Sequence, residues 1–300
     1  MLIGRRKFLQ ALGLMGLAAC SSEERNRNPF QPGGILALDW ALAETMVALG
    51  HPPAGVVAAA DWARFVVEPA LPAGVADLGL QQELNLELMA ALRPARILIS
   101  PFLAHLKPIL ERIAPTLNLS VYETGDAPMA NRIRVTHELA SHIGAEQAAA
   151  RLVLSLESRR TAAVEGLSRL PRKPVLLVSF IDNRHARVYA GGSLYADVLA
   201  WLGLDNAWSR PVGRFGFSTV GIEELALLGD IELIAVEPVP PDISRALSSS
   251  PLWTELPFVR AGQHGRIPPV FMFGALPSAA RMVDLLVPHL RQQWQRMHAP

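Results

Sequence analysis

The chain has 300 residues, half of them hydrophobic, and a formal net charge of +1. This length suits two domains with a substantial core. The sequence has neither a basic stripe with interleaved aromatic residues nor an acidic tail, which argues against nucleic acid as a partner.

Residues 1–20 predict an export signal, because Arg5 and Arg6 precede an apolar stretch too short to span a bilayer. GRRKFLQ resembles the twin-arginine export signature, and LAAC, ending in Cys20, resembles a bacterial lipobox. Cys20 is the only cysteine, so no internal disulfide is available. We therefore expect a periplasmic lipoprotein anchored to a membrane through acylated Cys20; the alternative is a soluble periplasmic protein cleaved nearby. Residues 21–34 are polar and rich in Pro and Gly, which predicts a flexible tether.

Residues 35–144 predict a first α/β lobe. Strands are expected at 35–40, 55–60, 75–80, 95–100 and 119–124. Helical segments lie between these short apolar runs, and such alternation predicts a parallel sheet.

Residues 145–170 carry a continuous helical pattern around which the chain is organised. The segment follows Gly144 and precedes Pro171, a plausible stop at each end. Its apolar stripe recurs at steps of four and seven, at Leu152, Leu156, Ala163 and Leu167. Roughly 26 residues make a rod about 39 Å long. The pattern predicts a rigid connection between two lobes; the alternative is an ordinary long core helix of a single domain.

Residues 171–300 repeat the rhythm of the first segment and predict a second α/β lobe. Strands are expected at 174–181 and 231–238, and helices at 193–203 and 280–294.

Several sequence blocks carry a resemblance that covers nearly the whole mature chain. In the first half these are ALDW, EPALP, DLGL, NLELMAALRP and ERIAP. In the second half they are SFIDNRHARVY, GGSLY, NAWSR, STVGIEELA, PLWTELPFVRAG and VFMFGALPSA. These blocks resemble the ferric hydroxamate (ferrichrome) binding proteins of bacterial siderophore uptake, which are substrate-binding components of ABC importers.

The resemblance implies a fold and a function. The fold is two α/β lobes joined by one long rigid helix, the helical-backbone or class III type of periplasmic binding protein, with a ligand cleft between the lobes. The implied monomer captures an iron(III)–siderophore complex and delivers it to an ABC permease, whose ATPase subunit supplies the energy. A haem or cobalamin receptor of the same fold is the alternative within this class. A rigid connecting helix predicts little closure on ligand binding.

The resemblance also implies ligand-binding residues. The family's hydroxamate-binding arginine falls on Gln81 and its tyrosine on Leu103, so neither the charged fork nor the hydroxyl is kept. The expected aromatic lining consists of Phe65, Phe215, Phe271 and Phe273, with fewer polar tips than in the family. Such a cleft suits a bulky chelate whose charge its own ligands have neutralised. A ferric hydroxamate other than ferrichrome is therefore the expected ligand.

Charged residues are expected in loops that could reach the cleft. These are Arg64, Arg184, Arg187 and Arg214, each of which has a solvated surface charge as its alternative. His185 is expected either to line the cleft or to cap a turn. Of this group, Arg184 and His185 are the ones we predict as ligand-binding.

Glu87 and Glu223 begin comparable helices, one in each lobe. In the family, a glutamate on each lobe docks onto arginines of the permease, and the resemblance implies this role for both residues. The alternative is the ordinary preference for acidic residues in a first helical turn.

A periplasmic hydrolase or metal-dependent enzyme is the rival class. In HELASH, His137 and His142 are five residues apart and would lie on different faces of a helix. GGSLY is not a nucleophile elbow, and no dinucleotide fingerprint, P-loop or CxxC is present. The sequence therefore predicts no catalysis, no cofactor and no protein ligand to the iron.

Overall fold

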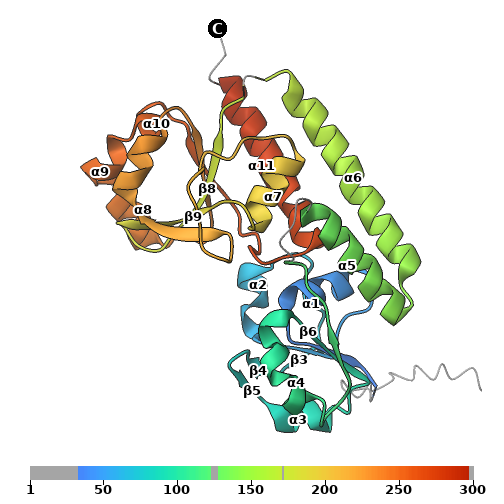
Figure 1. Cartoon of the computed structure of the whole chain (residues 1–300). Helices are drawn as coiled ribbons and strands as arrows, with labels where there is room; N and C mark the ends of the chain where they lie inside the picture. Colours follow the sequence, from blue (N-terminus) through green and yellow to red (C-terminus); the bar gives the residue numbers. More distant parts are fainter. Residues whose placement is uncertain (1–32, 123–127, 171, 297–300) are drawn as a thin grey trace, which may run out of the picture.

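The computed structural model describes residues 33–122, 128–170 and 172–296. The predicted signal with Cys20, and residues 21–32 of the predicted tether, lie outside the described residues. The chain folds into two α/β lobes, one above the other in Figure 1, with a long helix running beside both. The expected two-lobed architecture is confirmed.

The first lobe contains a five-stranded sheet in which every neighbouring pair is parallel, in the order β3-β2-β1-β6-β7. Its strands are β1 (Ile35–Ala37), β2 (Gly55–Val56), β3 (Ala76–Asp77), β6 (Arg96–Ile99) and β7 (Thr116–Asn118). A hairpin of β4 (Gly79–Leu80) and β5 (Glu83–Leu84) projects from this sheet. The helical elements are α1 (Trp40–Ala48), η1 (Ala59–Asp61), α2 (Trp62–Phe65), α3 (Leu86–Ala91), η2 (Pro101–Leu106), α4 (Lys107–Leu110) and α5 (Pro128–Ile143).

One expected strand of this lobe is misplaced. The sequence predicts a strand at 119–124, but the last strand, β7, ends at Asn118. The hydroxyl of Ser120 accepts a hydrogen bond from the backbone N–H of Tyr122 (3.2 Å), which turns the chain away from the sheet. The turn matters for the site described below, because it points Val121 into the core and Tyr122 into a cavity.

The second lobe contains a mixed sheet in the order β10-β9-β8-β11-β12. β8 (Val175–Phe180), β11 (Glu232–Val236) and β12 (His264–Ile267) are parallel, whereas β9 (His185–Tyr189) and β10 (Phe217–Gly221) pair antiparallel. The sequence did not predict β9, which is connected to β8 by a tight turn. The other elements are α7 (Leu194–Trp201), η3 (Ile222–Leu228), α8 (Pro241–Ser248), α9 (Pro251–Thr254), α10 (Pro257–Arg260) and α11 (Leu276–Arg296).

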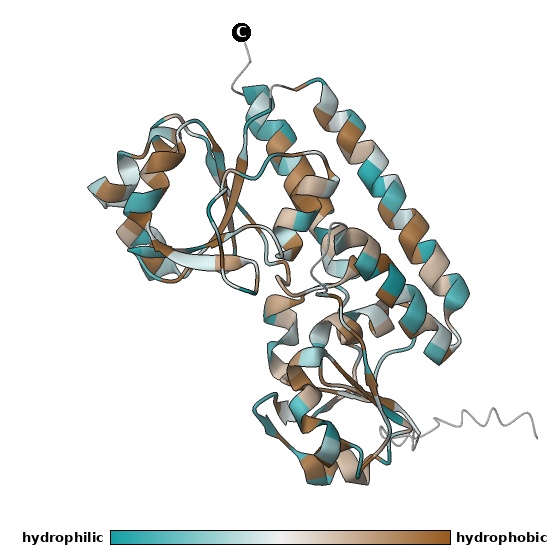
Figure 2. Ribbon diagram, in the orientation of Figure 1, coloured by the Kyte–Doolittle hydropathy of each residue, from teal (hydrophilic) through white to brown (hydrophobic). Residues whose placement is uncertain are grey.

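The connecting helix is α6, Glu146–Ser168, about 35 Å long at 1.5 Å per residue. Its buried stripe of Ala149, Leu156, Ala163 and Leu167 faces the lobes, and its remaining surface carries the hydrophilic residues visible in Figure 2. Ala149 packs in a cluster with Leu49 and Ala140 of the first lobe. The other three belong to the largest core cluster, which also contains residues of β8, α7 and α11. The helix therefore contacts both lobes along one face.

Two buried polar contacts also join the lobes. On α5, Arg132 donates from Nη1 to Asp197 Oδ2 on α7 (2.6 Å). On α1, the Glu44 carboxylate accepts hydrogen bonds from the backbone N–H of Ala275 (2.5 Å) and the hydroxyl of Ser278 (2.6 Å) at the start of α11. A carboxylate at a helix N-terminus is favourably placed for the helix dipole, although burial raises the pKa of Glu44 to about 7. These contacts tie helices of the first lobe to helices of the second.

A second buried carboxyl group predicts an unusual pH dependence of stability. Glu232, at the start of β11, is fully buried, and neither of its carboxyl oxygens has a hydrogen-bond partner among the residues that the structure describes. Burial raises its pKa from 4.5 to about 7, against the opposing effect of the Lys173 charge. Between these values the folded chain keeps a proton that the unfolded chain releases, so stability is lost as the pH rises through this window.

We expect replacement of Glu232 by glutamine to flatten this dependence, because glutamine keeps the shape and cannot titrate. The wild-type free energy of unfolding should fall, relative to that of Glu232→Gln, by about 1 kcal/mol per pH unit at the steepest point. Thermal unfolding at pH 5, 6 and 7.5 measures this difference, with Glu165→Gln on the exposed face of α6 as the matched control. Parallel pH profiles for wild type and Glu232→Gln would contradict the prediction.

Candidate functional site

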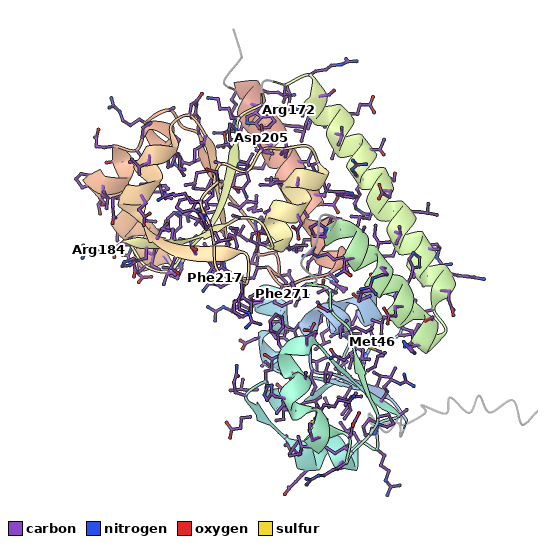
Figure 3. All side chains as sticks on the ribbon, in the orientation of Figure 1. Met46, Arg172, Arg184, Asp205, Phe217 and Phe271 are labelled. Carbon is purple, nitrogen blue, oxygen red and sulfur yellow. The ribbon has the colours of Figure 1, made fainter. Side chains whose placement is uncertain are left out.

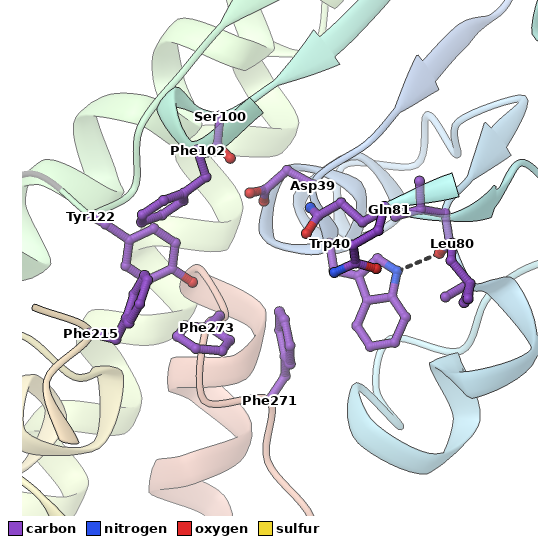
Figure 4. A pocket seen from close by; sticks show the side chains of 13 residues that line it. Asp39, Trp40, Leu80, Gln81, Ser100, Phe102, Tyr122, Phe215, Phe271 and Phe273 are labelled. Carbon is purple, nitrogen blue, oxygen red and sulfur yellow. Dashed lines mark hydrogen bonds between the residues drawn. The ribbon is translucent and has the colours of Figure 1, made fainter. Parts of the chain in front are cut away.

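A cavity of about 460 Å³ lies where the two lobes meet (Figure 4). From the first lobe it is lined by residues that follow the carboxyl ends of parallel strands or the tip of the β4–β5 hairpin. These residues are Asp39, Trp40, Val57, Ala58, Leu80, Gln81, Gln82, Ser100, Phe102 and Tyr122. From the second lobe it is lined by Phe215, Phe271 and Phe273. Loops at the carboxyl ends of parallel strands are the usual ligand-binding edge of an α/β sheet.

Two further cavities adjoin the first and extend it along the gap between the lobes. One, of about 390 Å³, shares Trp40, Phe271 and Phe273 with the first cavity. The other, of about 510 Å³, shares Phe102, Tyr122, Phe215 and Phe273. Phe273 lines all three, so together they form one continuous cleft with this ring at its centre.

Aromatic rings from both lobes line the cleft. Phe273 has ring centroids of Tyr122, Phe215 and Phe271 at 6.0–6.1 Å, and Phe271 lies 5.4 Å from Trp40. The Trp40 indole is fixed by a hydrogen bond from Nε1 to the carbonyl of Val57 (2.6 Å), drawn as a dashed line in Figure 4. Rings contributed by both lobes therefore form an apolar surface suited to a bulky ligand.

The polar groups of the central cavity are few and come from the first lobe. The Asp39 carboxylate caps α1 by accepting from the backbone N–H groups of Ala41 (2.9 Å) and Leu42 (3.3 Å). Burial raises the pKa of Asp39, against the lowering effect of the Ser100 hydroxyl and these two amides. The hydroxyl oxygens of Ser100 and Tyr122 are buried and have no well-aligned hydrogen-bond partner in the described chain. Buried hydroxyls without partners are suited to hydrogen-bonding a ligand.

The structure brings most of the predicted aromatic residues together. Phe215, Phe271 and Phe273 lie in the central cavity, and Phe65 lines the adjoining one. Gln81 also reaches the central cavity, where its side-chain amide donates to the carbonyl of Leu38 (3.1 Å).

The resemblance predicts Leu103 in the cleft, but the structure places it elsewhere. It is 4% exposed and packs in the core of the first lobe with residues of β1 and β6. Its neighbour Phe102 lines the cleft instead. The reason is local: η2 begins at Pro101, and in its tight turn consecutive side chains point in different directions.

Arg184 and His185 also lie away from the cleft, which agrees with the alternatives left open for them, a surface charge and a turn cap. They lie at the turn between β8 and β9, where the Asp182 carboxylate accepts from both of their backbone N–H groups (2.7 Å each). His185 Nδ1 is 3.0 Å from Asp182 Oδ2, and Figure 3 places Arg184 at the outer edge of the second lobe, far from Phe217 and Phe271. Neither lines the three cavities. His185 therefore stabilises the turn, and other residues of β9 point into the cleft.

Of the other three arginines expected near the cleft, two have exposed side chains over aromatic rings and one lies inside a cavity. Arg64 lies over the ring of Phe65 (5.1 Å to the centroid), and Arg214 lies over those of Phe102 (5.4 Å) and Phe215 (5.1 Å). Both side chains are exposed. Arg187, expected in a loop, lies instead within β9 and lines the cavity of about 390 Å³.

The sequence prediction missed Asp39, Trp40, Ser100, Phe102, Tyr122 and Met272 as cleft residues. A signal for the first four was available. They lie at or just after the carboxyl ends of two of the predicted strands, and the carboxyl ends of parallel strands converge on one edge.

Glu87 and Glu223 are both exposed, in the first turns of α3 and η3. Glu224, next to Glu223, is bound to Arg210 (2.8 Å). Of this pair Glu223 is thus the carboxylate available to another protein.

Within the described residues, no group of three or more His, Cys, Asp or Glu side chains is placed to hold a metal ion. None of the helices in that part of the chain combines the length and apolarity needed to cross a membrane.

Two lobes, a rigid connecting helix and a cleft walled by aromatic residues define a ligand-binding protein of the two-lobed class. A model of the periplasmic binding protein family matches residues 35–270, and the chain belongs to this family. It is 32% identical to the iron(3+)-hydroxamate-binding protein FhuD of Escherichia coli, covering 95% of this chain and 96% of that protein. It is 29% identical to the achromobactin-binding periplasmic protein of Dickeya dadantii, covering 87% of each.

A solved structure with a similar fold is the Fe3+–Desferal-bound siderophore-binding protein FhuD of Vibrio cholerae. The TM-score is 0.81 and the identity 26%, over 90% of this chain and all of that one. The resemblance stated from the sequence blocks is thereby confirmed.

Proposed function

We propose that the chain is the extracytoplasmic substrate-binding component of an ABC importer. It captures a ferric siderophore, with the hydroxamate type favoured, in the cleft between its lobes and delivers it to a membrane permease. The observation that carries this proposal is the continuous aromatic cleft between the lobes, in a chain 32% identical to an iron(3+)-hydroxamate-binding protein.

The chemistry of the cleft fits a metal chelate better than a small polar solute. Aromatic faces provide area for a bulky ligand whose charges cancel internally. The iron keeps its own siderophore ligands and is cargo, and the protein contributes no atom to its coordination. The hydroxyl of Tyr122, which has no hydrogen-bond partner among the described residues, and that of Ser100 beside Asp39 supply part of the polar recognition that Gln81 and Leu103 do not. The protein performs no catalysis in this role.

The junction between the lobes supports a largely pre-formed cleft. Helix α6 contacts both lobes, and the Arg132–Asp197 and Glu44–Ser278 contacts cross between them. A pre-formed site spares the entropy of ordering on binding. Small-angle scattering should therefore show little contraction when ligand is added.

Anchoring is proposed from the sequence alone. Cys20, at the end of a lipobox, would be acylated and hold the periplasmic chain to a membrane after export by the twin-arginine route. Intact-mass analysis of membrane-extracted protein tests this, because the absence of a diacylglycerol mass on Cys20 would refute it.

The test of function is a titration of the purified 21–300 fragment with ferric hydroxamates, ferric catecholates, haem and cobalamin. Quenching of tryptophan fluorescence reports binding, since Trp40 lies in the cleft, and native mass spectrometry confirms the stoichiometry. We expect tight one-to-one binding of a ferric hydroxamate. Binding only of a catecholate or a tetrapyrrole would overturn the ligand class, and binding of none would overturn the receptor role.

Charge reversal at the proposed docking residues is expected to separate uptake from binding. Glu87→Arg or Glu223→Arg should reduce siderophore uptake in cells by at least about tenfold, because like charges then face the permease arginines. Ligand affinity of the purified variants should stay at the wild-type value, since both residues lie outside the cleft. Glu165→Arg on the exposed face of α6 is the matched control. Loss of affinity, or uptake equal to that of the control, would contradict the docking role.

A further inference from the structure

The cavity of about 390 Å³ on the second-lobe side of the cleft contains a polar corner. Its apolar part is formed by Trp40, Phe65, Phe271 and Phe273. Its polar part comes from two adjacent strands: Ser179 on β8, and Arg187 and Tyr189 on β9. The hydroxyls of Ser179 and Tyr189 are 3.0 Å apart and hydrogen-bonded to each other. Because alternate residues of a strand share a face, Arg187 and Tyr189 both point to the cleft while Ala186 and Val188 enter the core.

Arg187 is held in a defined position by contacts with an aromatic ring and a methionine sulfur. Its guanidinium carbon lies 4.3 Å from the centroid of the Phe217 ring, and Nη1 is 3.7 Å from the sulfur of Met272. Stacking on an aromatic face keeps the planar fork of an arginine pre-organised. The side chain is therefore ordered before any ligand arrives.

The half-buried Arg187 side chain lacks the carboxylate partner that the buried Arg132 has. Nε of Arg187 is buried with no hydrogen-bond partner, and Arg187 takes part in none of the ion pairs of the described residues. Arg132, by contrast, has Asp197 at 2.6 Å. The cavity's lining includes one carboxylate, the exposed Glu237 at its rim, and no ion pair joins it to Arg187. A buried N–H donor of a charged group, such as Nε of Arg187, is costly to leave without an acceptor, and a ligand can supply one.

We infer that Arg187, with the Tyr189 and Ser179 hydroxyls beside it, binds oxygen atoms of the siderophore from the second lobe. The ligand group would be a planar pair of oxygens, such as a hydroxamate of the chelate, which matches the arginine fork. Arg187 on the second lobe thus provides the positive charge for ligand binding that Gln81 on the first lobe does not. This inference rests on the proposed function and assigns the polar contact within it.

The test compares Arg187→Met, which keeps the apolar stem, and Arg187→Lys, which keeps the charge without the fork. Arg210→Met is the matched control, because Arg210 also lies over an aromatic ring of the second lobe, that of Trp208 at 4.0 Å, but is paired with Glu224. Affinities for ferrichrome and ferrioxamine B are measured by fluorescence quenching, and near-ultraviolet circular dichroism checks the fold.

We expect Arg187→Met to lower affinity for the ferric hydroxamate that wild type binds by about 10- to 100-fold, the loss of hydrogen bonds to a charged group. Arg187→Lys should fall between this variant and wild type, and Arg210→Met should bind normally. Wild-type affinity in a folded Arg187→Met would overturn the inference. If that variant does not fold, Arg187→Lys decides: reduced affinity supports the inference and unchanged affinity overturns it. Failure of wild type to bind any ferric hydroxamate would instead refute the proposed ligand class.

Discussion

Replacement of Phe273 by alanine is expected to lower the affinity for the ferric siderophore by about 100-fold, a loss typical of an aromatic residue central to a binding surface. Phe273 lines all three parts of the cleft and contacts rings from both lobes. Its removal would take away the central contact surface and let water into the cleft. Fluorescence quenching by the ligand measures the change.

Two further variants delimit this prediction. Phe273→Leu keeps an apolar side chain and should recover part of the affinity, because area is retained while the flat ring is lost. Leu227→Ala removes an exposed apolar side chain outside the cleft, 78% exposed, and should leave binding unchanged. Phe273→Ala binding as tightly as wild type would place the ligand elsewhere.

Replacement of Arg132 by leucine is expected to destabilise the protein by about 3–5 kcal/mol, because it leaves the partner carboxylate buried and unpaired. Arg132 is 1% exposed and bonded to Asp197 at 2.6 Å, and its Nε lies 3.4 Å from the carbonyl of Gly274. Burial raises the pKa of Asp197 and Arg132 lowers it, so without the arginine the carboxylate has no compensation. Urea unfolding measures the loss, which corresponds to a Tm lower by about 10 °C.

A double variant tests whether the loss of stability comes from the unpaired buried charge. Arg132→Leu combined with Asp197→Leu removes both charges and should be less destabilised than the single variant. Arg134→Leu is the matched control on the same helix, since the Arg134–Glu138 pair is exposed and worth at most about 1 kcal/mol. An Arg132→Leu variant as stable as this control would show that the buried pair does not hold the lobes together.

The same contacts bear on how the receptor works. Arg132 reaches from α5 to α7, and Glu44 from α1 to the start of α11, so both buried polar contacts cross the lobe junction. A junction of this kind resists large domain closure, since a large rotation of one lobe against the other would expose or break these bonds. Recognition must then come from the shape and chemistry of a cleft that exists before ligand binds.

Elements with a local signal could be predicted from the amino-acid pattern. The apolar stripe of Leu156, Ala163 and Leu167 at steps of four and seven predicted a long helix, and α6 spans Glu146–Ser168. The alternation of apolar runs and helical segments predicted two α/β lobes, and the sequence blocks indicated the family. These features were readable because periodicity and short motifs depend on neighbours along the chain.

The identity of the side chains that form the cleft depends on tertiary packing. A shift of one residue in a tight turn puts Phe102 instead of Leu103 in the cleft. Strand alternation puts Arg187 and Tyr189 there as well, while Arg184 stays at a distant turn. The cavity assembles residues as far apart in sequence as Asp39 and Phe273. Their proximity arises from the packing of two sheets around a shared junction, and no local pattern of residues encodes that packing.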